Sequence, residues 1–196
     1  MCGAPQQGPT ETGEQIVCDA CLKQPRNWIS GRAALLYQDN GRRMVLGLKH
    51  GHRHEIARMA GGWMVQSVAD LLTPETLLVP VPLHWTRLLG RTFNQSVLLA
   101  RAMALDCGTE MLPDALARIR RTASLDRRSP TERQETLEHS MRATRHGEVA
   151  IKNRPVMIVD DVMTSGATFQ EATRACLAAG AASVCVVALA RAAKTA

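Results

Sequence analysis

Two adjacent carboxylates followed by a loop rich in hydroxyls form the segment of this chain best suited to chemistry. Asp160 and Asp161 come directly after an apolar run, and the residues that follow them are Val162, Met163, Thr164, Ser165, Gly166, Ala167 and Thr168. Hydroxyls and main-chain amides at the start of a helix hold a phosphate, and glycine lets the backbone approach closely. Paired acids suit a sugar diol and a divalent metal. The segment therefore predicts a ligand that combines a phosphate, a sugar and a metal ion.

The elements around the acids must place them at the edge of a sheet. The apolar run at 156–159 is typical of a buried parallel strand, and residues 169–179, closed by Gly180, have a helical pattern. Ligands of α/β sheets bind beyond the carboxyl ends of such strands. A P-loop is excluded as the phosphate site, because the pattern G-x-x-x-x-G-K-S/T does not occur in the chain. The alternative is a strand whose acids only cap a helix, although a cap needs a single acid or hydroxyl.

A second anion-binding pattern lies upstream. An apolar strand is predicted at 77–82 and a helix at 94–105, and the loop between them carries Arg87 and Arg91. Cations in a loop that leads to a free helix N-terminus bind anions such as a diphosphate. The alternative is that both arginines are solvated and that Asn94 is an ordinary helix cap.

Strands and helices alternate along the rest of the chain. This alternation predicts a doubly wound α/β domain with a mostly parallel sheet over residues 30–196, preceded by a short cysteine-containing module over 1–29. The other expected features are strands at 33–37 and 183–190, a helix at 56–72, a turn at 39–41, a short apolar segment at 44–48, and a charged stretch with a weak helical pattern at 113–140.

Composition excludes several classes of protein. Hydrophobic residues make up 45% of the 196 residues, which is ordinary for a globular chain. No apolar run reaches the roughly 20 residues that span a bilayer, and the N-terminus lacks a signal-peptide pattern. We therefore expect a cytoplasmic protein with no membrane partner. The net charge of +6 suits a polyanionic small substrate or a nucleic acid, and a solvated basic surface is the default alternative.

The segment from Val156 to Thr168 closely resembles the phosphoribosyl pyrophosphate (PRPP) signature of the type I phosphoribosyltransferases. Three upstream patterns narrow the resemblance to the competence protein F (ComF) family. These patterns are Leu-Lys-His-Gly at 48–51, Val-Pro-Val-Pro at 79–82 and Phe-Asn-Gln at 93–95. The family pairs an N-terminal four-cysteine zinc module with a phosphoribosyltransferase domain, and the resemblance covers nearly the whole chain.

The resemblance implies an enzyme of the phosphoribosyltransferase (pentosyltransferase) class, linked to DNA uptake in competence or to nucleotide salvage. Asp160 and Asp161 are expected to hold the ribose hydroxyls and the Mg²⁺ shell of PRPP, and the loop at 164–168 its 5-phosphate. Arg87 and Arg91 are expected to hold the pyrophosphate. Lys49 is expected to contact the acceptor or the diphosphate. The implied reaction is displacement of pyrophosphate from C1 of the ribose by a nitrogen nucleophile, through an oxocarbenium-like transition state. The sequence does not identify the acceptor.

The cysteines depart from the family pattern. Cys18 and Cys21 form one Cys-x-x-Cys pair, but Cys2 matches only the second half of the other. Three thiolates leave a tetrahedral structural zinc site one ligand short. Zn²⁺ held by these cysteines and an idle remnant of a metal site therefore both stay open.

The flexible loop of the family is also altered here, with Leu125 in place of a glutamine and Thr136 in place of an asparagine. Such a loop closes over the substrate and excludes water. A non-catalytic PRPP sensor, or a module that binds single-stranded DNA or a competence helicase, is therefore the rival interpretation, because fold does not settle function. The arginine-rich stretch 118–128 is its candidate contact, but aromatic residues for base stacking are scarce at 3%. A relic without any ligand is the third interpretation, and the intact signature disfavours it.

Overall fold

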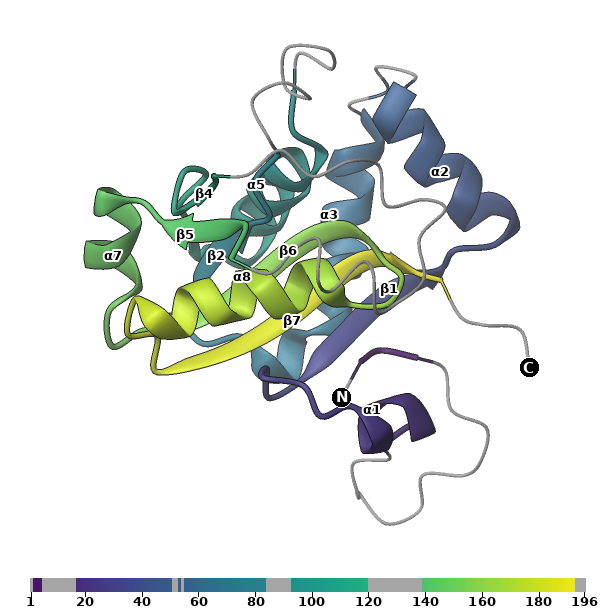
Figure 1. The fold of residues 1–196 in the computed structure, drawn as a ribbon. Coiled ribbons are helices and arrows are strands. Elements are labelled where there is room, and N and C mark those ends of the chain that lie inside the picture. Colours follow the sequence, from purple (N-terminus) through teal and green to yellow (C-terminus); the bar gives the residue numbers. More distant parts are fainter. Residues whose placement is uncertain are drawn as a thin grey trace.

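A parallel five-stranded sheet with the order β1-β7-β6-β2-β3 lies at the centre of the molecule (Figure 1). The structure is a computed structural model that describes residues 2–4, 17–50, 53, 55–83, 93–119 and 139–192. The strands of the sheet are β1 (Gly31–Leu36), β2 (Leu77–Pro80), β3 (Glu110–Met111), β6 (Pro155–Met163) and β7 (Ser183–Arg191). All four strand pairings in it are parallel. A separate antiparallel pair joins β4 (Leu116–Arg118) to β5 (Met141–Ala143).

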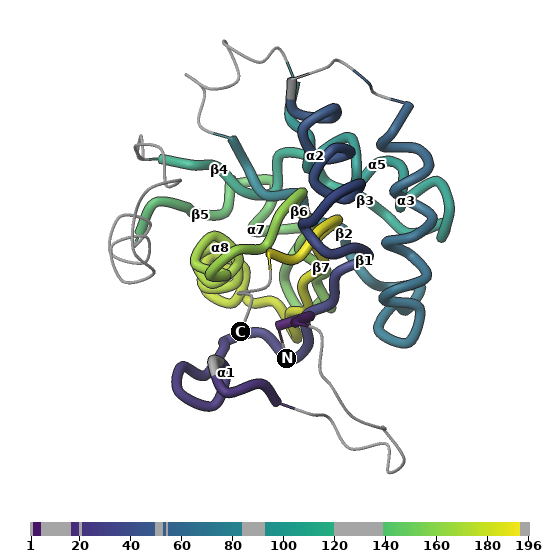
Figure 2. Tube along the Cα trace, turned by 90° about the vertical axis from the view of Figure 1, so that its right-hand side faces the viewer, coloured from purple at the N-terminus to yellow at the C-terminus, as the bar shows by residue number. Residues whose placement is uncertain are grey.

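Helices cover both faces of the sheet. The α-helices are α1 (Asp19–Lys23), α2 (Asp39–His50), α3 (Glu55–Ser67), α5 (Gln95–Cys107), α7 (Arg145–Ile151) and α8 (Ala167–Ala178), and a 3₁₀ turn, η1, spans Ala69–Leu71. Figure 2 shows α8 and α1 on one side of the sheet, with α2, α3 and α5 on the other. This arrangement confirms the expected fold class, a mostly parallel sheet preceded by a cysteine-containing segment (residues 2–4 and 17–29, the cysteine segment).

Two hydrophobic clusters follow from the alternation of side chains along the central strands. In β6, Val156 and Ile158 pack with α8 and the N-terminal cysteine segment, whereas Met157 and Val159 pack with α2, α3 and α5. Because both faces are covered, the part of the strand before the acid pair, residues 156–159, is entirely apolar, as its sequence predicts. The sheet therefore has two buried faces, and different parts of the chain cover each of them.

Helix α2 corrects two expectations. The turn expected at 39–41 and the short apolar segment at 44–48 belong to one helix that begins at Asp39. Asp39 adopts a φ of +40°, and a Cβ on Gly41 would collide with the carbonyl oxygen of Leu36. The turn-forming residues are thus used to start a helix directly after β1, where the backbone must approach the end of that strand.

Other boundaries differ by a few residues. The helix expected at 56–72 ends at Ser67 and is followed by η1, and the strand expected at 77–82 ends at Pro80. Helix α7 was not predicted. Most of the stretch at 113–140 lies outside the described residues, and its described beginning contains β4. Among the described helices, none has the length and hydropathy of a membrane-spanning segment.

Candidate functional site

Asp160 and Asp161 lie near the carboxyl end of β6, and a residue in the first turn of α5 forms a hydrogen bond with Asp160. The Ser96 hydroxyl donates a hydrogen bond of 2.7 Å to Asp160 Oδ1, and the Asp161 amide donates one of 2.9 Å to the same oxygen. Asn94 fixes the start of α5: its side chain accepts from the Ser96 amide and donates to the Val81 carbonyl at 3.0 Å. The end of β2, the start of α5 and the acids of β6 therefore form one connected edge.

Lys49 approaches the acid pair from α2. Its Nζ lies 3.1 Å from Asp161 Oδ2, and the two side chains are 23% and 11% exposed. Partial burial makes this ion pair stronger than one on an open surface, because solvent screens it less. The structure thus brings the lysine expected near the substrate into contact with one of the two acids.

The environment of Asp160 perturbs its ionisation. Burial, and then the negative charge of Asp161, raise the pKa of Asp160 to about 7. Hydrogen bonds from Ser96 and from the Asp161 amide, with the charge of Lys49, act in the opposite direction. A carboxyl group with a pKa near neutrality beside a second carboxylate favours binding of a cation, because the cation displaces the proton and offsets the repulsion between the two groups.

The loop after β6 turns into α8 at Gly166. This glycine has a φ of +84° and stands at the N-cap of the helix, and its carbonyl accepts from the Gln170 amide at 2.9 Å. A Cβ at this position would lie 3.1 Å from the Trp28 ring, so both the backbone conformation and the space favour glycine. The amides of Ala167 and Thr168 begin α8, and the Ser165 hydroxyl accepts from the Ala167 amide at 3.4 Å. Amides at such a helix start form an anion-binding site.

The underside of the loop rests on the N-terminal cysteine segment. Arg191, at the end of β7, donates to the Met163 and Thr164 carbonyls at 3.0 and 2.6 Å, and its Nε donates to the Cys2 carbonyl at 3.1 Å. The Trp28 ring meets the Phe169 ring edge-on, with centroids 6.3 Å apart. One guanidinium and one indole therefore connect the loop to the cysteine segment.

The sulfur atoms of Cys2, Cys18 and Cys21 all lie within 4.8 Å of one another, and the first two are 3.4 Å apart. Burial acts to raise the pKa of the Cys2 thiol, but hydrogen bonds from the Ala4 amide, the other two thiols and Arg191 outweigh it and lower the pKa to about 7. Burial raises the pKa of Cys21 to about 11, and the neighbouring thiols add to this shift. Thiolates bound to Zn²⁺ at 2.3 Å in a tetrahedron are roughly 3.8 Å apart, so the cluster fits three of the four ligand positions. Within the described residues, no fourth histidine, cysteine or acid joins the group.

Several candidate residues have no described geometry. Arg87 and Arg91 fall in the gap at 84–92, and the altered flexible loop falls in the gap at 120–138. Three residues at the site, Ser96, Arg191 and Trp28, were not predicted from the sequence. Only Ser96 had a local signal, since it directly follows the Phe-Asn-Gln pattern.

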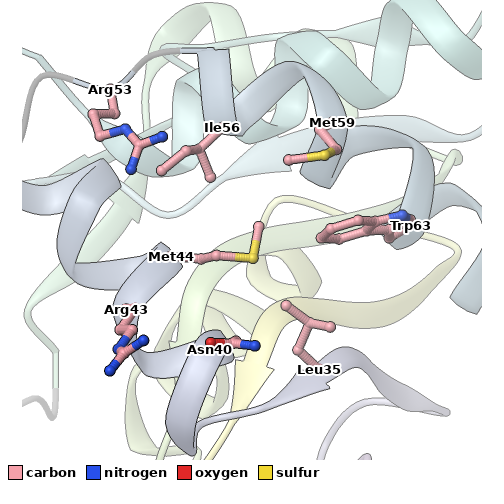
Figure 3. Close-up of a pocket in the computed structure, with 9 residues that line it drawn as sticks. Leu35, Asn40, Arg43, Met44, Arg53, Ile56, Met59 and Trp63 are labelled. Carbon is pink, nitrogen blue, oxygen red and sulfur yellow. The ribbon is translucent and has the colours of Figure 1, made fainter.

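A hollow of about 470 Å³ lies apart from the acids and the loop. It is formed by β1, α2 and α3, and its lining residues are Leu35, Asn40, Gly41, Arg43, Met44, Arg53, Ile56, Met59 and Trp63 (Figure 3). The lining is mostly apolar, and Arg43 of α2 and Arg53, two residues before α3, lie at one side of it. None of the residues that hold the acid pair or the loop lines this hollow.

Comparison with known proteins gives a consistent result over most of the chain. Residues 95–196 match the family described as "Phosphoribosyl transferase domain". The chain is 31% identical over 197 residues to DNA utilization protein YhgH of Salmonella typhimurium, and the alignment covers 97% of this chain and 82% of that protein. It is 30% identical over 192 residues to the protein of the same name from Escherichia coli strain K12, covering 95% and 83%. It is 27% identical over 181 residues to Competence protein F of Haemophilus influenzae, covering 89% and 78%.

Proposed function

We propose, from the premise that the chain belongs to the competence protein F family of phosphoribosyltransferase-domain proteins, that it binds PRPP with Mg²⁺ and transfers the phosphoribosyl group to a nitrogen acceptor. One observation carries the proposal. The acid pair and the helix-start loop are consecutive at the end of β6, and Ser96 and Lys49 hold the acids from two other elements. An acid pair that only capped a helix would not need a hydroxyl and an ammonium group from distant segments.

The ribose end of the ligand is assigned to the acids. Carboxylate oxygens accept hydrogen bonds from a sugar diol, and they suit the water shell of a hard cation such as Mg²⁺. Ser96 fixes the orientation of Asp160, and Lys49 neutralises Asp161 until the ligand arrives. When bound, Mg²⁺ would supply positive charge that stabilises the departing pyrophosphate. Lys49 is also close enough to the acids to contact the diphosphate or the acceptor.

The phosphate ends are assigned to two loops. The amides of Gly166, Ala167 and Thr168 and the hydroxyls of Thr164 and Ser165 are proposed to hold the 5-phosphate, with Val162 and Met163 as the last strand residues before them. The loop after β2 is proposed to hold the pyrophosphate through Arg87 and Arg91. In support, β2 pairs with β6, and the Val81 amide donates to the Val159 carbonyl at 2.9 Å. The chain therefore leaves β2 at the edge where the acids lie.

The reaction forms a bond from C1 of the ribose to the acceptor nitrogen and breaks the bond from C1 to the pyrophosphate oxygen. Positive charge develops on the sugar ring between these events, as in glycoside hydrolysis. The protein contributes mainly by holding the two reactants in line and by placing donors on the departing diphosphate. The nitrogen loses a proton after attack, and solvent can accept it at neutral pH.

Isothermal calorimetry with PRPP and Mg²⁺ tests the binding step. The double variant Asp160→Asn, Asp161→Asn should lower the affinity more than about 100-fold, because two charge-assisted contacts are lost. The matched control is Asp106→Asn, Asp114→Asn, which removes the same charge from exposed positions. Equal affinity in the two double variants would refute the site.

Turnover is tested separately by release of pyrophosphate across a panel of nitrogen bases and amines. Release that requires both PRPP and one acceptor identifies the enzyme. Tight PRPP binding without release for any acceptor would instead favour a PRPP sensor of the DNA-uptake machinery, in which single-stranded DNA or a helicase is the partner.

The names of the relatives, DNA utilization protein and Competence protein F, support a role of this chain in the use or uptake of DNA. The cytoplasm is the proposed compartment.

Zinc binding is proposed for the cysteine cluster, since three sulfur atoms converge there. Metal analysis of the purified full chain should find about one zinc per chain, and Cys18→Ser with Cys21→Ser should abolish it. A metal-free wild type with three reactive thiols would refute this part of the proposal without touching the PRPP site.

A further inference from the structure

Arg26 lies against the loop to which the 5-phosphate is assigned, although it belongs to the N-terminal cysteine segment. A Cβ placed on Gly166 would be 3.5 Å from Arg26 Nη1 and 3.7 Å from its Cζ. The Arg26 guanidinium also stacks near the Trp28 ring, with its Cζ 5.4 Å from the ring centroid. The indole therefore holds the cation beside the glycine, and any side chain at position 166 would intrude between Arg26 and the loop.

The charge of Arg26 is poorly compensated at this place. No carboxylate of the described residues lies within ion-pair distance of it. Its Nε is buried and has no hydrogen-bond partner within the described part of the chain. The thiol of Cys21 accepts a hydrogen bond from the guanidinium, and this bond acts to lower the pKa of that thiol. The start of α8 carries positive partial charge of its own, so a cation beside it is unfavourable unless an anion joins them.

The loop itself carries no charged side chain. Residues 164–168 offer only hydroxyls and main-chain amides, which are neutral donors. A phosphate monoester carries between one and two negative charges at neutral pH, and a hydrogen bond from a charged donor is about twice as strong as one from a neutral donor. Arg26 as a residue is half-buried and not fully enclosed by the protein. A cation from outside the loop is therefore what this phosphate site lacks.

We propose that the Arg26 guanidinium binds the 5-phosphate of the ligand together with the loop at 164–168, so that the cysteine segment forms one wall of the substrate site. This inference rests on the proposed function, and it extends the binding site to a part of the chain that the PRPP signature does not include. It also gives a second reason why residue 166 is a glycine, since a side chain there would separate the Arg26 guanidinium from the loop.

The test measures the binding of two fragments of PRPP to the full chain by calorimetry, ribose 5-phosphate and Mg²⁺-pyrophosphate. In Arg26→Met, which keeps an unbranched chain over the Trp28 ring, the affinity for ribose 5-phosphate and for PRPP should fall roughly 10- to 100-fold. The affinity for Mg²⁺-pyrophosphate should not change, because that group binds at the other loop. Arg26→Lys should recover part of the loss. Lys23→Met is the matched control, because it removes one charge from an exposed position of the same segment and should change neither affinity.

Three results would overturn the inference, and they are distinguishable. If the wild type binds neither PRPP nor ribose 5-phosphate, the proposed function falls and this inference with it. If the wild type binds both and Arg26→Met binds ribose 5-phosphate equally well, Arg26 is not a phosphate ligand and the proposed function stands. If Arg26→Met and Arg26→Lys both lose zinc, or both weaken ribose 5-phosphate and Mg²⁺-pyrophosphate to the same extent, Arg26 only supports the cysteine cluster.

Discussion

On the face of the sheet covered by α2, α3 and α5, side chains from two helices contact the acid pair directly, through the Ser96 hydroxyl and the Lys49 ammonium group. On the opposite face, the loop before α8 is held by the Arg191 side chain, which donates hydrogen bonds to main-chain carbonyls, and by the Trp28 ring. The contacts of the acid pair are thus polar and ionic, and a ligand can take their place. The contacts of the loop are packing against the Trp28 ring and hydrogen bonds from the Arg191 guanidinium to main-chain carbonyls.

This difference predicts two kinds of sensitivity. Substitutions beneath the loop should lower the stability of the whole chain, because that region belongs to the main hydrophobic cluster. Substitutions beside the acids should change stability less and change its pH dependence more.

Replacing Trp28 by alanine should have the largest effect. The indole is 2% exposed and packs on Phe169 and Gly166, so its loss should lower the free energy of unfolding by about 3–5 kcal/mol. Urea unfolding followed by circular dichroism measures this. The control is Trp63→Ala, at 36% exposure, which should lose much less. Equal losses in the two variants would remove the distinction between the faces of the sheet.

Replacing Arg191 by methionine should come second. The guanidinium donates to the carbonyls of Cys2, Met163, Thr164 and Ala192, and methionine would leave these acceptors short of a partner. We expect a loss of about 2–4 kcal/mol in the free energy of unfolding, together with faster hydrogen exchange of the amides that follow the loop. The exposed Arg145→Met serves as the control. A variant as stable and as protected as the control would show that the loop does not depend on this residue.

The ionisation of Asp160 should give the acid half a distinct pH signature. Its pKa in the folded chain is raised to about 7, so between about pH 4 and 7 the folded chain binds a proton that the unfolded chain has released. Stability should therefore fall as the pH rises through this window, by more than about 1 kcal/mol. Unfolding curves at several pH values measure the slope, and Asp160→Asn should reduce it. A slope unchanged in the variant would assign it to other groups.

Replacing Ser96 by alanine should have the smallest effect on stability, about 1 kcal/mol, because one hydrogen bond to a carboxylate is lost. That bond acts to lower the pKa of Asp160, so its removal should move the carboxyl titration to still higher pH. Infrared or NMR titration of the carboxyl group follows this shift. A titration that moved to lower pH would contradict the hydrogen bond to the ionised form.

Much of the fold was accessible from local patterns, and the errors have local causes. The apolar strand before Asp160 and the helix after Gly166 were predicted within a few residues, because strand burial and helix periodicity are written in consecutive positions. Helix α2 was missed because Asp39 and Gly41 resemble a turn, and only the close approach to Leu36 shows that they start a helix. Helix α7 was missed because its seven residues are too few to show a period.

The sequence by itself determined that two acids and a phosphate-type loop stand side by side, because both lie within nine consecutive residues at a strand-to-helix junction. Only the tertiary structure decided which side chains reach them. Lys49, Ser96 and Arg191 come from α2, α5 and β7, and the sheet order β1-β7-β6-β2 brings these elements to β6. Trp28 and Arg26 come from the cysteine segment, which meets the loop on the α8 face of the sheet. Partners this far apart in the chain leave no spacing pattern, because their proximity arises from strand pairing and packing, which long-range contacts establish.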